Sequence, residues 1–280
     1  MTSYAKTTLR ILALTLPLAC LAGCGGSTPA APTPVFPNVT GNWQFEVRIL
    51  VPAPPNPPSP VSIPVGVVFG SLTSSGGKVT GILNVRPSEP NACVANNADL
   101  AVTGTVDAAG NLSLTGPIAG GVQTITAAIE SQPLSLSATN GTYQVVGGPC
   151  AQAPTTIIAF HVLDAGGTYM GTMTQRIPAG SGSLTVKAVL AESATPDADG
   201  EFPLTGTVTY SGDCTGTLSF TNGVVFGEQL QSGPLSPNFS TSIQLFSAGV
   251  PLVPSQPMTA SFFKPTGCTG VSYVGNLTRQ

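Results

Sequence analysis

The chain has 280 residues, of which only 8% are charged, and a formal net charge of −3 at pH 7. Soluble domains typically carry about 25% charged residues, so Ser, Thr, Asn, Gln and Gly must supply most of the polar surface. The shortage of Lys and Arg argues against a basic nucleic-acid-binding patch. The same shortage, together with few Glu, disfavours surface helices.

The first segment of the chain is typical of a secretory leader. Lys6 and Arg10 precede an uncharged apolar run over residues 11–22, and a basic head followed by a short apolar core is the pattern of an export signal. The run is shorter than the roughly 20 residues of a membrane-spanning helix, and Pro17 disfavours a stable helix there. We therefore expect residues 1–23 to be a signal peptide.

The end of this run carries Leu21, Ala22, Gly23 and Cys24. These four residues resemble the lipobox of bacterial lipoproteins. The resemblance implies cleavage before Cys24, a diacylglyceryl group on its sulfur and an acyl chain, such as palmitate, on its amino group. Two or three acyl chains attach a protein stably to a membrane. The alternative is an ordinary leader in which Cys24 has no role and the protein is released.

Cleavage before Cys24 leaves 280 − 23 = 257 residues, with 9 − 2 = 7 basic and 12 acidic side chains, a net charge of −5. Residues 25–34 are small or proline and cannot bury a core, so we expect residues 24–37 to be a lipidated tether. By the same resemblance the protein belongs in the bacterial cell envelope. Gly25 in place of Asp after the anchor implies the outer membrane, facing the periplasm or the surface.

Folding is expected to start near Asn38. Trp43 begins a run in which apolar and polar residues alternate, as in a half-buried strand. Residues 52–60 are proline-rich and predict an extended loop. Short strands separated by Gly-rich turns then follow to the end of the chain. They are expected at residues 43–49, 61–72, 79–85, 100–106, 112–115, 122–129, 142–146, 156–162, 168–173, 184–190, 204–208, 217–220, 242–246, 259–263 and 271–277.

This pattern predicts an all-β fold of antiparallel sheets in two related barrel-like or sandwich-like halves. We place a first β domain at residues 38–163 and a second at residues 164–280. The halves share an aromatic start, at Trp43 and Tyr169, and a Thr-Gly-Thr-Val segment, at residues 103–106 and 205–208. Whether these similarities reflect a duplication or convergent β composition stays open at this point.

Four cysteines remain in the exported body: Cys93, Cys150, Cys214 and Cys268. An even number in an oxidising compartment favours disulfides. Of the three possible pairings we predict Cys93–Cys150 and Cys214–Cys268, because each would close one loop in each half. A metal site is disfavoured, since the body has no Cys-x-x-Cys and the chain has one histidine.

No catalytic or cofactor-binding pattern stands out. His161 lies in an apolar strand, and the chain has no Gly-x-Ser-x-Gly elbow to supply a nucleophile. Asp197, Asp199 and Glu201 surround Gly200, but their spacing departs from known calcium loops, so a solvated hairpin loop is the preferred interpretation. We expect no enzyme activity, no cofactor, no metal and no nucleic-acid partner.

The leading hypothesis is a non-enzymatic lipoprotein with a structural or interaction role in the envelope. An alternative is lipocalin-like binding of a small apolar ligand, for which a cavity lined by Trp43, Phe45, Phe160 or Tyr169 is required. A distant alternative is an envelope hydrolase, for which His161 or several acids must gather in one cleft with perturbed pKa values.

Overall fold

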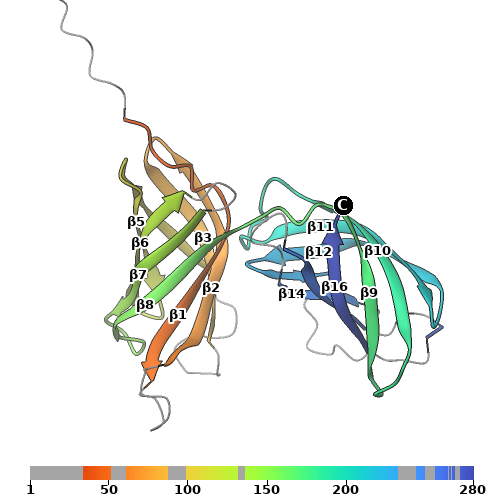
Figure 1. The fold of residues 1–280 in the computed structure, drawn as a ribbon. Helices are drawn as coiled ribbons and strands as arrows, with labels where there is room; N and C mark the ends of the chain where they lie inside the picture. The colour runs from red at the N-terminus through yellow and green to blue at the C-terminus, as the bar shows by residue number, and fades with distance from the viewer. Residues whose placement is uncertain are drawn as a thin grey trace, which may run out of the picture. The chain divides into compact units, whose positions relative to one another are not determined.

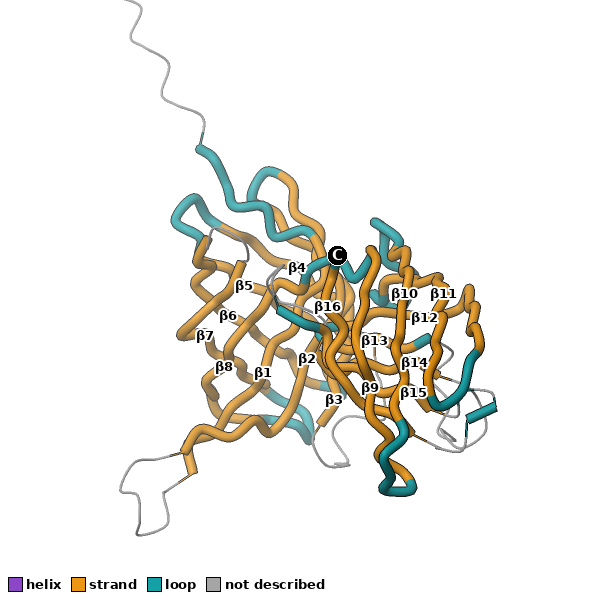
Figure 2. The backbone as a smooth tube through the Cα atoms, turned by 45° about the vertical axis from the view of Figure 1, so that its right-hand side comes forward, coloured by secondary structure: helices purple, strands orange, loops and turns teal. Residues whose placement is uncertain are grey.

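The computed structural model describes residues 34–51, 61–87, 99–131, 136–232, 244–249 and 256–280, except 264, 266 and 269–271. Every regular element in these ranges is a β-strand, drawn in orange in Figure 2. The all-β prediction is confirmed. Within the same ranges, no helix is long and apolar enough to cross a membrane. The folded strands belong to one compact unit, Val35–Gln280.

The first eight strands form a closed antiparallel barrel. Each strand pairs with the next one in the chain, and β1 closes the ring by pairing with β8. Figure 1 shows this barrel in red to green. Its strands are β1 (Gly41–Val51), β2 (Val61–Ser75), β3 (Lys78–Pro87), β4 (Asp99–Val106), β5 (Asn111–Ile118), β6 (Gly121–Ser131), β7 (Leu136–Val146) and β8 (Gln152–Val162).

The last eight strands form a second antiparallel barrel, which closes where β16 pairs with β9. Figure 1 shows it in green to blue. Its strands are β9 (Gly167–Ile177), β10 (Ser183–Glu192), β11 (Phe202–Gly212), β12 (Gly216–Phe226), β13 (Gln229–Gln231), β14 (Gln244–Gly249), β15 (Met258–Phe263) and β16 (Ser272–Arg279). The prediction of two barrel-like halves is confirmed.

Period-two patterning places one face of each strand inside its barrel. In β5, buried and exposed residues alternate along the whole strand, and β10 shows the same alternation from Ser183 to Ala191. Each barrel has its own cluster of buried apolar side chains. An eight-stranded barrel has an interior just wide enough for side chains to fill. Burial of these inward residues is therefore the main term that stabilises each ring.

Threonine hydroxyls supply much of the outer wall, as the low charge requires. Cross-strand threonine pairs stabilise sheets modestly while keeping the surface polar. Neighbouring strands of the first barrel bring four threonines opposite one another, in one row across β3 to β6: Thr80, Thr103, Thr115 and Thr124. The outer wall along this row is therefore neutral and hydrogen-bonding.

Two hairpin loops share one construction. In the β4–β5 loop, Asp107 Oδ1 accepts hydrogen bonds from the backbone N–H groups of Ala109 and Asn111. In the β10–β11 loop, Asp197 Oδ1 accepts in the same way from the N–H groups two and four residues later. Each loop then uses a glycine with positive φ, Gly110 at 88° and Gly200 at 78°. The acidic group around Gly200 thus builds a turn, as the hairpin interpretation expects.

The Thr-Gly-Thr-Val segments do not occupy equivalent positions. The first lies in β4, the fourth strand of its barrel, and the second lies in β11, the third strand of its barrel. The aromatic starts do correspond, because β1 and β9 are both first strands. The shared segment therefore gives no support to a duplication. The sequence also missed β13, whose three residues are too short for a periodic pattern.

Candidate functional site

The anchor and one predicted disulfide involve residues outside the described ranges. Cys24 and Cys93 both lie there, so lipid attachment at Cys24 and the Cys93–Cys150 pairing stay predictions. Cys150 follows β7 and packs, partly buried, against the core of the first barrel. Cys150 also contributes, after burial, to raising the pKa of the Tyr143 hydroxyl to about 12.

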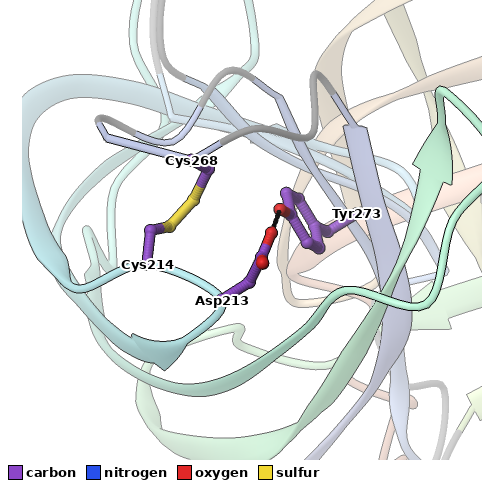
Figure 3. The surroundings of a disulfide bond; sticks show 4 residues. All are labelled: Asp213, Cys214, Cys268 and Tyr273. Atoms are coloured by element: carbon purple, nitrogen blue, oxygen red, sulfur yellow. Dashed lines mark hydrogen bonds between the residues drawn. A yellow bond between two sulfur atoms is a disulfide. The ribbon is translucent and has the colours of Figure 1, made fainter.

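The predicted pairing in the second barrel is confirmed. Cys214, in the turn after β11, is bonded to Cys268, which precedes β16, with a Cα–Cα distance of 4.9 Å. Figure 3 shows Asp213 beside this bond, with its carboxylate accepting a hydrogen bond from the Tyr273 hydroxyl on β16. The disulfide and the hydrogen bond therefore join the same two parts of the barrel.

His161 has a packing role in the structure. Its ring meets the Trp43 ring edge to face at 5.4 Å between centroids, and Nε2 lies 3.2 Å from the Thr40 carbonyl oxygen. Burial lowers the pKa of the His161 imidazole, with the Thr40 contact opposing. These two contacts hold the imidazole between an indole and a backbone carbonyl.

The aromatic residues proposed for a ligand cavity divide between three places. Trp43 and Phe45 lie fully buried inside the first barrel and stack on each other. Tyr169 is fully buried in the second barrel. Phe160 is half-buried and lies on the other face of β8 from the buried Ile157 and Ala159. The four aromatics therefore do not line one common cavity.

One polar side chain inside the first barrel has unmet hydrogen-bonding capacity. Gln123 lies on β6 in the inward-facing series with Ile125, and only 1% of its surface is exposed. Neither its amide nitrogen nor its amide oxygen has a hydrogen-bond partner among the described residues. A buried amide without partners costs about 1–3 kcal/mol per group. The Gln123 amide therefore either destabilises the fold or forms hydrogen bonds with a bound molecule.

A cluster of ionisable groups lies at one end of the second barrel, where the chain arrives from the first barrel. Glu192, at the end of β10, accepts a hydrogen bond from the Ala165 backbone N–H at 2.6 Å. Burial, with a smaller contribution from the nearby Asp164, raises the pKa of the Glu192 carboxyl to about 7. The Ala165 N–H and Arg279 oppose the shift. Glu192 therefore exchanges its proton near neutral pH.

Two neighbours complete this cluster. The guanidinium carbon of Arg279 lies 6.0 Å from the centroid of the Tyr169 ring. The Tyr169 hydroxyl is buried with no hydrogen-bond partner among the described residues, and burial raises its pKa. A half-buried acid with a pKa near 7 beside an arginine and a tyrosine marks a candidate functional site. We call Glu192, Tyr169, Arg279 and Asp164 the Glu192 cluster.

Sequence analysis missed this cluster, although a signal was present. The strand predicted at residues 184–190 has one apolar face, made by Leu184, Val186, Ala188 and Leu190. Continuing this two-residue period to residue 192 places Glu192 on the same, inward face. An acid on the inward face at a strand end predicts a buried carboxylate. Arg279 carries no comparable signal, because its closeness to β10 depends on ring closure.

Polar side chains on the outer wall of β1 contact the turn that follows β12. Asn42 exchanges two hydrogen bonds with the backbone of Gly227, at 2.9 and 3.1 Å, and Gln44 Oε1 accepts one from the Glu228 N–H. Phe69 and Phe226 pack beside them with centroids 5.1 Å apart. These contacts explain why Asn42 and Gln44 are buried although they face away from the barrel interior.

No three His, Cys, Asp or Glu side chains in the described part of the chain are grouped as ligands for a metal ion. Comparison with known protein families, curated proteins and solved structures found no match. The function must therefore be argued from the chain's own residues.

Proposed function

We propose that this protein is an exported, lipid-anchored lipoprotein of the bacterial cell envelope with a non-enzymatic structural or interaction role. The observation that supports this role most is that each barrel has its own cluster of buried apolar side chains. A filled barrel presents its outer wall and its loops, rather than its interior, to other molecules.

The N-terminal sequence supports the location. Leu21, Ala22, Gly23 and Cys24 form the lipobox-like segment, and a proline-rich stretch separates it from the first strand at Gly41. A tether of this kind holds folded barrels away from the membrane surface. The neutral, hydroxyl-rich wall described above suits contacts that form through hydrogen bonds and shape rather than through charge.

The Cys24→Ala variant tests the anchor. We expect the full-length protein, expressed in a bacterial host, to move from the membrane fraction to the soluble fraction, because no thioether can form at alanine. Intact mass should show wild-type protein starting at Cys24 with acyl chains, and the variant without them. Cys20→Ala is the matched control and should leave both readouts unchanged. Membrane attachment that persists in Cys24→Ala would refute the anchor.

A second candidate function is binding of a small, mostly apolar ligand inside the first barrel. The observation that favours it is the Gln123 amide, which offers one acceptor and two donors within an otherwise apolar interior. A ligand with an apolar body and one carboxyl, amide or hydroxyl group matches that combination.

Gln123→Leu distinguishes the two functions. If the interior is simply filled, we expect the variant to raise the free energy of unfolding by about 1–3 kcal/mol, because an unsatisfied amide is replaced by an apolar group of similar size. Denaturant unfolding of the purified protein measures this. Gln144→Leu, at a half-buried position on β7 outside the inward-facing series, is the control and should change little. A destabilised variant that also loses a mass retained by the wild type in native mass spectrometry would favour the ligand.

A further inference from the structure

The segment joining the two barrels is held at three consecutive backbone positions. The Ala165 N–H donates to Glu192, the Asp164 carbonyl accepts from Arg279 at 3.2 Å, and the Gly166 carbonyl accepts from the same guanidinium. Ala165 is fully buried and belongs to the apolar cluster of the second barrel. A connection between two domains is ordinarily exposed and weakly bound, so this degree of fixation needs a reason.

The two side chains that hold the segment come from opposite sides of β9. Glu192 ends β10 and Arg279 ends β16, and both strands pair with β9. Together they span the first residues of β9, where the joining segment enters the barrel. The segment is therefore held by the ring itself, across three neighbouring strands.

The groups that face Glu192 are Asp164 on the joining segment, Arg279 on β16 and Tyr169 on β9. Arg279 and the Ala165 N–H favour the charged carboxylate, whereas burial and Asp164 disfavour it. The Tyr169 hydroxyl, buried without a hydrogen-bond partner among the described residues, lies near enough to this cluster for Asp164, Glu192 and Arg279 to influence its pKa. The stability of the closed arrangement therefore depends on the protonation state of Glu192.

We propose that Glu192 and Arg279 form a clamp on residues 164–166, and that the clamp opens when the Glu192 carboxyl loses its proton to water. In the closed state Glu192 is half-buried, and the partial loss of hydration favours the neutral carboxyl. In the open state it is hydrated, which favours the ion. Deprotonation therefore shifts the equilibrium toward the open state, with the carboxylate formed on Glu192 and the proton taken up by solvent.

The pH window follows from the two states. The pKa of Glu192 is about 7 in the closed state and near the ordinary value of 4.5 once the group is exposed. A group whose pKa is raised by burial stabilises the closed state fully below its exposed pKa, and that stabilisation is lost as the pH rises to the closed-state pKa. Clamp opening should thus increase between about pH 4.5 and pH 7, on the order of 100-fold, and then level off.

Hydrogen exchange followed by mass spectrometry on the full-length protein tests the clamp. We expect the protection factor of the Ala165 amide, corrected for intrinsic exchange, to fall on the order of 100-fold between pH 4.5 and 7.5 in the wild type. In Glu192→Gln, whose amide oxygen still accepts the Ala165 hydrogen bond, protection should stay constant. The same fall in Glu192→Gln, or no fall in the wild type, would overturn the proposal.

Two further variants separate the clamp from general effects of pH. Asp107→Asn makes the same carboxyl-to-amide change in an exposed turn, where hydrogen bonds from Asn111 lower the pKa of Asp107 below its ordinary value, so it should retain the wild-type fall at Ala165. Arg279→Gln removes two of the three holding hydrogen bonds and should reduce protection at every pH. Equal protection in Arg279→Gln and wild type would also overturn the proposal. His161, whose pKa burial lowers, and Glu228, whose pKa burial raises, are retained in all four proteins.

Discussion

Replacing Cys214 and Cys268 together with serine is expected to lower the free energy of unfolding of the second barrel by about 4 kcal/mol. The disulfide closes a loop with a sequence separation of 54 residues, and a cross-link of that length removes many conformations from the unfolded chain. The Asp213–Tyr273 hydrogen bond links the same two parts of the barrel, so the variant should still reach its native topology.

The single tryptophan allows the two barrels to be followed separately. Trp43 lies in the first barrel, so its fluorescence in a denaturant titration reports on that barrel, while hydrogen exchange in β10, β11 and β16 reports on the second. The loss should be confined to the second barrel. Wild-type protein unfolded with a reducing agent is the control and should reproduce the loss in the second barrel. An unchanged midpoint for the second barrel would show that the disulfide adds nothing to its stability.

Trp43→Ala is expected to lower the free energy of unfolding of the first barrel by about 3–5 kcal/mol, as for other fully buried aromatics. The indole is completely buried, stacks on Phe45 and meets the His161 ring. Its Nε1–H donates to the Val39 carbonyl at 2.8 Å, so removal also leaves a buried acceptor without its partner. Trp43 therefore supports the barrel wall and the segment that leads into it.

Thermal unfolding by circular dichroism and exchange of the β1 amides measure this loss without tryptophan fluorescence. Trp43→Phe is the matched control, because it keeps most of the apolar volume and loses only the hydrogen bond and one ring. It should fall between wild type and Trp43→Ala. If the two variants were equally stable, packing volume at this position would not be the source of the effect.

Much of the fold was readable from local pattern. Alternation predicted the strands around Trp43, Leu112 and Leu184, since a strand with one buried face repeats every two residues. Ring closure was not readable, because pairing of β1 with β8 depends on shear and curvature that no local pattern encodes. β13 was missed for a different reason: three residues give no period to detect.

The contacts at the candidate sites also differ in whether the sequence predicts them. The Cys214–Cys268 pairing followed from counting cysteines and from one loop per half. Glu192 required only that the β10 period be carried two residues further. The burial of Gln44 depends on Glu228, which lies 184 residues later in the chain, and no spacing rule connects them. Such contacts can be identified only once the fold is known.

The closed rings also bear on how fast this chain reaches its native state. The β1–β8 pairing brings Asn42 beside Val162, a separation of 162 − 42 = 120 residues. Rings closed by such distant contacts fold slowly, because the entropy of a long loop is lost before the closing contacts form and stabilise the ring. Until β8 has paired with both, β1 and β7 each keep one unpaired edge open to other chains. The interval before ring closure is therefore the stage of folding at which this chain is most open to aggregation.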